Sequence, residues 1–174
     1  MTDISAESLI KDLNLKPLPW EGGYYRETWR SEVLVPEQAL GPSYTGPRAA
    51  GTSIYYMLTP DTLSKMHRLP SPETFHFYMG DAVQMQLLHP DGTDQMITFG
   101  QDLSAGQHLQ FTILGNTWMG GRLAPGNLRG DSHGYALMGT TVAPGFDFDD
   151  LEMGGTDALI TEYPGPADMI RALT

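Results

Sequence analysis

The chain has no cysteine among its 174 residues. This absence excludes disulfide bonds, thiolate zinc sites and cysteine nucleophiles, and it is compatible with a reducing compartment. The sequence also lacks any run of about 18 apolar residues, the length that crosses a bilayer, and it does not begin with the basic and apolar regions of a signal peptide. We therefore expect a cytoplasmic protein that has no membrane partner.

Basic residues are scarce, since 10 lysines and arginines stand against 21 aspartates and glutamates and give a net charge of −11. A field of this sign repels phosphate backbones, so nucleic acid is not an expected partner. A small anion can still bind near Arg26, Arg68 or Arg122, because distant surface charge is screened over about 10 Å. The alternative for each of these arginines is a solvated surface position.

Glycine and proline, by contrast, are plentiful, with 20 and 13 residues spread along the chain. They separate short runs rich in tyrosine, threonine, isoleucine, valine and phenylalanine, which is the pattern of strands joined by turns. The length of the chain suits a single domain over residues 1–174. The runs predict strands at 24–29, 52–58, 64–68, 73–79, 82–89, 94–99, 107–112, 117–123 and 135–142.

Helices are expected only near the two ends of the chain. Apolar residues at helical spacing predict a first helix that begins after Ser5, its N-cap, and stops near residues 14–17, and residues 167–173 predict a short closing helix. The proline-rich stretch 36–48 is expected to be a surface loop. Many short strands with terminal helices predict an all-β antiparallel sandwich or barrel, with the jelly roll as the expected member.

Residues 67–80 combine two histidines and a glutamate with an aromatic strand. Imidazole and carboxylate groups transfer protons and bind metals near neutral pH, so we expect His67, Glu73, His76 and Tyr78 to be catalytic. Alternate residues of a strand point to opposite faces, which separates Glu73 from His76 and Tyr78. Which of these two faces lines a cavity is left open by the sequence.

The same segment resembles the first cupin motif, in which two histidines, a glutamate and a glycine follow at fixed spacing. His67, Glu73 and Gly80 fall on that pattern, while Leu69 occupies the position of the second histidine. In the segment that is similar to the second motif, Trp118 takes the place of the third histidine. Two of the usual metal ligands are therefore replaced.

Four blocks in order make the chain similar to the Cupin_5 subfamily, at residues 22–28, 52–60, 66–78 and 141–150. This resemblance implies a double-stranded β-helix, a cupin jelly roll with short N- and C-terminal helices, whose fold relatives include dTDP-sugar 3,5-epimerases and germins. It also implies a homodimer that pairs sheets between subunits, and the 24–29 run is the candidate for an exchanged or interfacial strand. It implies no established reaction.

His67 and Glu73 alone are too few for a stable transition-metal site, which needs three or four converging ligands. His76 would be a third ligand only if a bulge turned it to the face of Glu73. We therefore expect no metal and no other cofactor. Without a metal, Glu73 would orient His67 and set its tautomer, and the pair would act as general acid and base.

Further residues are expected to contact a ligand. In the epimerases that share the fold, a histidine removes a proton next to a carbonyl and a tyrosine returns one, which makes Tyr56, Tyr78 and Tyr135 candidates. The indole of Trp118 offers a flat face for a sugar ring or a base, although core packing is an equal alternative. The predicted ligand-contacting residues are Ser64, Arg68, Tyr56, Trp118, Tyr135, Phe146 and Asp147.

Three of these residues carry a more specific expectation. Arg68 should point away from the face of His67, so a surface salt bridge is the stronger interpretation for it. Phe146 and Asp147 are expected to close the rim of a pocket, while Asp149 and Asp150 are expected to be solvated.

Three functional hypotheses remain open. The first is a metal-independent isomerase or epimerase that binds a small polar organic molecule, such as a sugar or a nucleotide-like compound. The second is a non-catalytic ligand-binding or sensor protein. The third is a metal-dependent enzyme that uses His67, Glu73 and His76.

Overall fold

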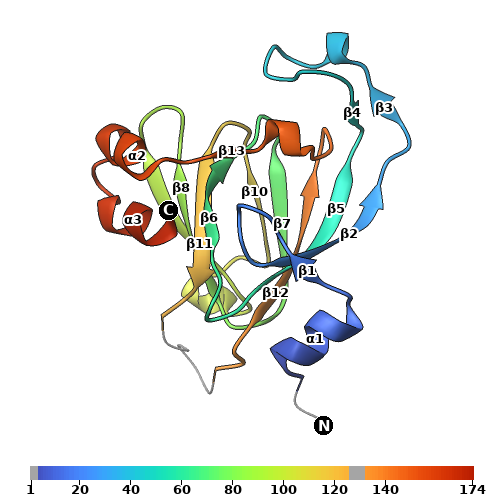
Figure 1. The fold of residues 1–174 in the computed structure, drawn as a ribbon. Coiled ribbons are helices and arrows are strands. Elements are labelled where there is room, and N and C mark those ends of the chain that lie inside the picture. The colour runs from blue at the N-terminus through green and yellow to red at the C-terminus, as the bar shows by residue number, and fades with distance from the viewer. Residues whose placement is uncertain (1–3, 126–131) are drawn as a thin grey trace.

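The computed structural model describes residues 4–125 and 132–174 and consists mainly of two antiparallel sheets packed face to face (Figure 1). The six-stranded sheet has the order β1 (Lys16–Pro17), β2 (Tyr24–Arg30), β5 (Thr52–Leu58), β12 (Ala136–Val142), β7 (Glu73–Gly80) and β10 (Gln110–Ile113). The five-stranded sheet has the order β13 (Glu152–Met153), β6 (Ser64–Arg68), β11 (Trp118–Leu123), β8 (Val83–Leu88) and β9 (Asp94–Phe99). Strands distant in sequence thus lie side by side, and the expected all-β jelly roll, a double-stranded β-helix, is confirmed.

The inner faces of the two sheets form the main core. Along β7 the side chains alternate, so that Glu73, Phe75 and Phe77 are buried while His76 is half-buried and Tyr78 is exposed. This period of two follows from the pleat of the strand. The face that carries Glu73 is therefore the inner one, which settles the question that the sequence left open.

The glycine of the first motif has a steric role at the end of β7. Gly80 has a φ of +102°, a conformation that side chains disfavour, and a Cβ at this position would collide with the carbonyl oxygen of Tyr135. Only glycine lets the chain turn here while β7 stays paired with β12.

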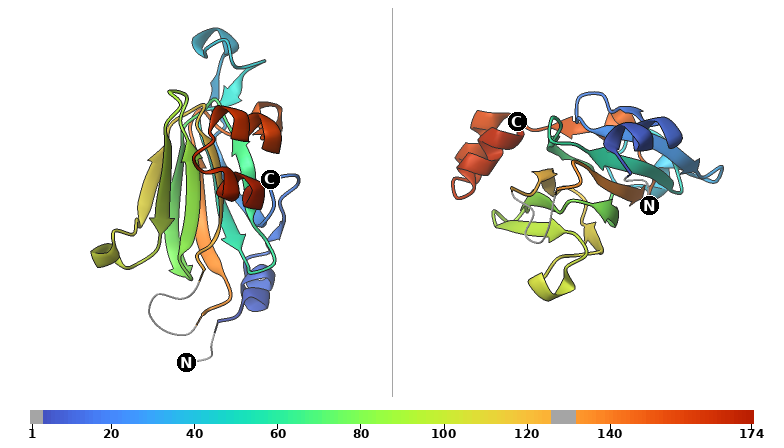
Figure 2. Two further views of the ribbon diagram at one scale, coloured as in Figure 1. Left: turned by 90° about the vertical axis from the view of Figure 1, so that its left-hand side faces the viewer. Right: turned by 90° about the horizontal axis from the view of Figure 1, so that it is seen from below.

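Helices pack on the outer faces of both sheets, and on the six-stranded sheet α1 covers only part of the face (Figure 2). Helix α1 (Ala6–Asp12) has the expected N-cap Ser5 in a capping box with Ser8, and its Leu9 packs with Met57 on the six-stranded sheet. The expected closing helix is α3 (Ala167–Leu173), and the sequence did not indicate the preceding helix α2 (Thr156–Glu162). Both C-terminal helices pack on the outer face of the five-stranded sheet.

The stretch expected as a loop belongs to a small arm that extends beyond the sandwich (Figure 1). Strands β3 (Leu34–Val35) and β4 (Arg48–Ala49) pair there, with the 3-10 helix η1 (Glu37–Ala39) between them. The base of the arm is fixed by Arg48, whose Nε and Nη2 lie 2.7 and 2.6 Å from the carboxylate oxygens of Asp150. The Asp150 side chain is 4% exposed, so the expectation that it is solvated was wrong.

Two further 3-10 helices complete the structure, η2 (Leu103–Ala105) and η3 (Phe148–Asp150). Across the described ranges 4–125 and 132–174, the helices are all too short or too polar to span a bilayer. The cytoplasmic location stays a prediction.

Candidate functional site

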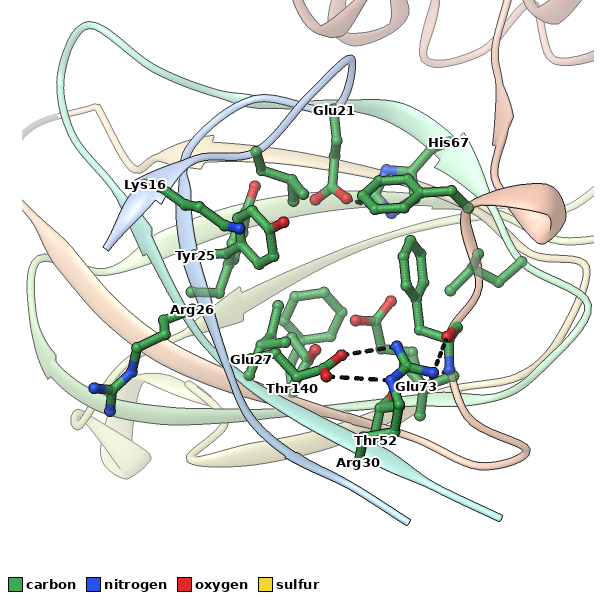
Figure 3. A pocket seen from close by; sticks show the side chains of 18 of the residues that line it. Lys16, Glu21, Tyr25, Arg26, Glu27, Arg30, Thr52, His67, Glu73 and Thr140 are labelled. Atoms are coloured by element: carbon green, nitrogen blue, oxygen red, sulfur yellow. Dashed lines mark hydrogen bonds and ion pairs between the residues drawn. The ribbon is translucent and has the colours of Figure 1, made fainter. Parts of the chain in front are cut away.

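A cavity of about 390 Å³ lies between the two sheets, within the size range of small-molecule sites (Figure 3). Its back wall is the inner face of the six-stranded sheet, where the register places Thr52 and Glu73 on either side of Val142. His67 and Leu69 line the side of the five-stranded sheet. The remaining wall comes from the N-terminal segment that contains β1 and β2.

His67 is held in a defined orientation on β6. Its side chain is 2% exposed, and its Nδ1 lies 2.7 Å from the carbonyl oxygen of Lys65. Because a carbonyl oxygen only accepts hydrogen bonds, Nδ1 carries a hydrogen, and in the neutral ring Nε2 is the proton acceptor. Nε2 lies 3.8 Å from Oε2 of Glu21. The expectation that Glu73 orients His67 is therefore wrong, since the Lys65 carbonyl does so.

Glu21 is a site residue that the sequence did not single out. It is 8% exposed, and its Oε1 accepts a hydrogen bond of 3.0 Å from the hydroxyl of Ser64. The chain reverses directly after it through Gly22 and Gly23, whose φ values are +101° and +73°. These glycines were part of a block similar to Cupin_5, and they were the available signal for Glu21. Ser64 itself is fully buried and acts by holding Glu21, outside the cavity lining.

Glu73 carries a strongly perturbed carboxyl group. Burial raises its pKa to about 7, and the charge of Glu21 adds to the increase, while the charge of His67 and a hydrogen bond with Thr140 oppose it. A carboxyl with this pKa exists in both protonation states near neutral pH. It can therefore serve as a general base or a general acid in the cavity.

The pKa of Glu73 predicts a dependence of stability on pH. Its pKa is higher in the folded state than the ordinary 4.5, so the folded protein binds more protons between pH 4.5 and about 7. The stability contributed by the protonated carboxyl is fully present below pH 4.5 and is lost as the pH rises through about 7. We expect Glu73→Gln to gain about 3 kcal/mol in unfolding free energy relative to the wild type between pH 4.5 and 8.

Urea denaturation at a series of pH values measures this difference, because other titrating groups cancel between the two proteins. The exposed Glu32 offers a control, since Glu32→Gln should follow the wild-type curve at every pH. Parallel curves for Glu73→Gln and the wild type would show that Glu73 keeps an ordinary pKa.

Tyr56 is the predicted tyrosine that the fold brings into the cavity lining. It is 1% exposed, and its hydroxyl donates a hydrogen bond of 3.2 Å to the carbonyl oxygen of Gly22. Burial and the charge of Glu21 raise its pKa well above the ordinary value. The Tyr56 side chain therefore stays protonated at neutral pH and ties the Glu21 turn to the six-stranded sheet.

His76 and Tyr78 do not reach the cavity, which corrects the expectation that they act with Glu73. Both lie on the outer face of the six-stranded sheet because they have the opposite parity to Glu73 on β7. His76 Nε2 lies 3.2 Å from the hydroxyl of Thr141, and Tyr78 is 43% exposed with its ring against Tyr55. The structure gives neither residue access to a ligand beside Glu73.

Trp118 and Arg68 also lie outside the cavity. Along β11 it is Met119 that pairs with His67 and joins the core between the sheets, so Trp118 points to the other face and packs under the C-terminal helices. Arg68 stacks over the Trp118 ring at 4.4 Å and pairs with Glu152 at 2.8 Å. Of the alternatives, core packing for Trp118 and a salt bridge for Arg68 agree with the structure.

Tyr135 and Asp147 have structural positions as well. Tyr135 is 3% exposed and belongs to the cluster beneath α1, away from the cavity lining. The Asp147 carboxylate accepts a hydrogen bond of 3.0 Å from the backbone N–H of Asp149, at the start of η3. The ligand contacts expected for these two residues are not supported.

Phe146 does line the cavity, and it belongs to an aromatic group at the rim. Its backbone N–H donates to the Thr52 hydroxyl at 3.0 Å, and its ring lies 5.0 Å from that of Phe148. Phe148 in turn contacts the exposed Trp20 at 5.4 Å. Aromatic rings at the cavity thus come from Phe146 and Phe148, and not from Trp118.

Three cationic residues of the N-terminal segment are near the cavity, in different situations (Figure 3). Arg30 is engaged by the Glu27 carboxylate at 2.7 Å and by the Phe146 carbonyl oxygen at 3.0 Å. The guanidinium of Arg26 turns away and lies 5.3 Å from the centre of the Tyr55 ring. The ammonium of Lys16 lies over the Tyr25 ring at 5.2 Å.

The side chains around His67 do not fit a metal site of the cupin type. Leu69 stands at the second ligand position, and apolar Met119 lies opposite His67. Over residues 4–125 and 132–174, no three histidine, cysteine, aspartate or glutamate side chains come together as a metal-binding group. The His67, Glu73 and His76 set fails because His76 lies on the opposite face of the sheet.

Comparison with known proteins gives consistent matches over most of the chain. The family model Cupin_5, described as Cupin superfamily (DUF985), matches residues 7–154. The uncharacterized protein YML079W from Saccharomyces cerevisiae is 35% identical over 152 residues, which cover 84% of this chain and 73% of that protein.

Solved structures are similar over nearly the whole chain. A hypothetical protein from Leishmania major gives a TM-score of 0.86 at 32% identity, covering 98% of this chain and 99% of that chain. Protein SO0799 from Shewanella oneidensis gives 0.81 at 32% identity, with 98% of each chain covered. Oxalate decarboxylase from Bacillus subtilis gives 0.53 at 12% identity over 93% of this chain and 37% of that chain, which shows a shared fold alone.

Proposed function

The chain belongs to the Cupin_5 family (DUF985) of the cupin superfamily, and we propose that it binds a small polar organic molecule in the central cavity. We further propose that it isomerises or epimerises this molecule by acid–base chemistry. A sugar or a nucleotide-like compound is the proposed ligand class. The side chains that would carry out the reaction are Glu73 and His67.

One observation carries this proposal: two proton-transfer groups face one cavity from opposite sheets. Glu73 comes from β7 of the six-stranded sheet and His67 from β6 of the five-stranded sheet. A ligand between them would have one group on each side. This arrangement suits removal of a proton from one face of a carbon atom and return of a proton to the other face.

In the proposed reaction, the Glu73 carboxylate takes a proton from a carbon atom next to a carbonyl group. The electron pair of the broken C–H bond forms an enolate, and protonated His67 donates a proton through Nε2 to the opposite face. The nearby Glu21 carboxylate stabilises the positive charge of the imidazolium before this transfer. Exchange with water then returns Glu73 and His67 to their starting protonation states.

Incorporation of deuterium from solvent tests the proposal. Ketosugars, sugar phosphates and nucleotide sugars are incubated with the protein in D₂O, and proton NMR follows the C–H signal next to the carbonyl group. We expect protein-dependent loss of this signal for at least one compound. Compounds that bind without any exchange would support the second hypothesis instead, a non-catalytic binding protein.

We also propose that the chain forms a homodimer through the outer face of its six-stranded sheet. A row of contacting side chains crosses this face beside α1 and includes no carboxylate, although the chain has 21 acidic residues. Two copies with a net charge of −11 repel one another least where such a surface meets its equivalent. The row consists of Arg26, Ser53, Tyr55, Thr74, His76, Tyr78, Thr112 and Thr141.

Light scattering at micromolar concentration measures the oligomeric state. We expect a dimer for the wild type and a monomer for Tyr78→Glu, because the substitution places a carboxylate in the middle of this row. Leu103→Glu, at an exposed position on η2, is the control and should remain dimeric. A monomeric wild type, or a Tyr78→Glu variant that remains dimeric, would contradict this interface. Because β2 pairs with β1 and β5 of its own chain, the proposed interface consists of side chains on the outer face of the sheet and involves no exchange of the 24–29 strand.

A further inference from the structure

The cavity has an end where hydrogen-bond donors have no partner. Lys16 and Tyr25 face each other across the β1–β2 pairing, and Asn14 precedes them in the same wall. Among the described residues, the Lys16 ammonium, the Tyr25 hydroxyl and the Asn14 amide have no hydrogen-bond or ion-pair partner, apart from the contact of Lys16 with the Tyr25 ring. Lys16 and Asn14 are open to solvent and Tyr25 is half-buried, so all three donors of this wall are accessible to a small anion.

Farther from Lys16, the cavity presents hydrogen-bond acceptors and carboxylate groups. Glu21 lies next to His67, with 3.8 Å between its Oε2 and Nε2 of His67, and Glu73 lies on the side of the cavity away from Lys16 (Figure 3). A negatively charged ligand group would be repelled from that end, whereas sugar hydroxyls would donate hydrogen bonds to it. The cavity therefore orients a ligand that has an anion at one end and hydroxyl groups at the other.

Lys16 is the cation best placed to recognise the anion. The charge of Arg30 is neutralised by the bidentate contact with Glu27, and the guanidinium of Arg26 turns to Tyr55. Since the whole chain carries a net charge of −11, long-range attraction does not bring an anion to this site. Recognition depends on the local donors.

We infer that the ligand is a phosphorylated compound whose phosphate group binds to Lys16, Tyr25 and Asn14, with its hydroxyl-bearing part directed toward Glu73 and His67. Only the orientation of the hydroxyl-bearing part toward Glu73 and His67 rests on the proposed function. The phosphate contact itself concerns binding, so it can be measured without any turnover.

Calorimetric titration with matched probes tests the inference. Fructose 6-phosphate is compared with fructose, and adenosine monophosphate with adenosine; gluconate tests whether a carboxylate serves equally well. We expect at least one phosphorylated probe to bind about tenfold or more tightly than its neutral counterpart. Lys16→Gln should remove this preference, and Lys16→Arg should keep it.

Lys11→Gln is the matched control, because Lys11 is an exposed lysine at the end of α1 that lies outside the cavity lining. It should bind every probe like the wild type. Equal affinity for neutral and phosphorylated probes, no binding of either phosphorylated probe or of inorganic phosphate, a stronger preference for gluconate, or an unchanged preference in Lys16→Gln would each overturn the phosphate inference.

The outcomes separate this inference from the proposed reaction. A Lys16-dependent phosphate preference without deuterium exchange would support the anion site and contradict catalysis. Deuterium exchange into neutral sugars, with no preference for phosphate, would support catalysis and contradict the anion site.

Discussion

Glu73→Gln is expected to reduce the rate of solvent-deuterium exchange into a substrate by about 10²- to 10⁴-fold, the usual contribution of a general base. Glutamine has nearly the same size and keeps the hydrogen-bonding capacity that Thr140 uses, but it cannot accept the proton. The variant should therefore fold normally and still bind ligand. Proton NMR measures the exchange, and a thermal melt establishes that the variant is folded.

The controls for this prediction come from the same strand and the opposite sheet. Tyr78→Phe should exchange at the wild-type rate, because Tyr78 lies on the outer face, whereas His67→Asn should lose exchange as Glu73→Gln does. In the wild type the rate should fall as the pH is lowered below about 7, because Glu73 then takes up a proton and cannot act as the base. An unchanged rate in Glu73→Gln would remove Glu73 from the mechanism.

Arg48→Met is expected to destabilise the protein by about 3–5 kcal/mol, the cost of leaving a buried charge without its partner. The Arg48 and Asp150 side chains are 5% and 4% exposed and share two hydrogen bonds. Removal of the guanidinium leaves the buried Asp150 carboxylate without an ion-pair partner beneath the β3–β4 arm. Urea denaturation measures the loss in unfolding free energy.

Arg171→Met provides the matched control, since the pair of Arg171 with Asp168 is exposed and should contribute less than about 1 kcal/mol. The double variant Arg48→Met/Asp150→Leu should recover much of the lost stability, because it leaves no unpaired charge. A loss of less than about 1 kcal/mol in Arg48→Met would mean that water reaches Asp150 and that the pair does not anchor the arm.

The fold was predictable because alternation and turn residues mark strands of five or more residues. The strands from β5 to β9 fall within two residues of their expected limits. Two-residue strands such as β1 and β13 have no period to detect, since they exist only through pairing with β2 and β6. Helix α2 was missed for a related reason: its burial depends on packing against the five-stranded sheet.

The site residues were predictable only where they fall on a position of a known motif. The positions of His67 and Glu73 followed from the first motif, and both line the cavity. The resemblance to the second motif predicted Trp118 at the cavity, one residue away from the correct position. Strand pairing places Met119, and not Trp118, opposite His67. Glu21 and Lys16 were missed because they are far in sequence from the first motif. They reach the cavity only through the tertiary fold, when the N-terminal segment packs beside His67 and Glu73.

The division of the cavity wall has a consequence for how specificity can diverge within such proteins. In the proposed function, the reactive pair of Glu73 and His67 lies on β7 and β6, whereas the donors that would select the ligand come from residues 14–30. Substitutions confined to that one stretch can exchange one substrate for another while the reactive pair stays as it is. Relatives that share His67 and Glu73 but differ there would form a series of enzymes with one chemistry and many substrates.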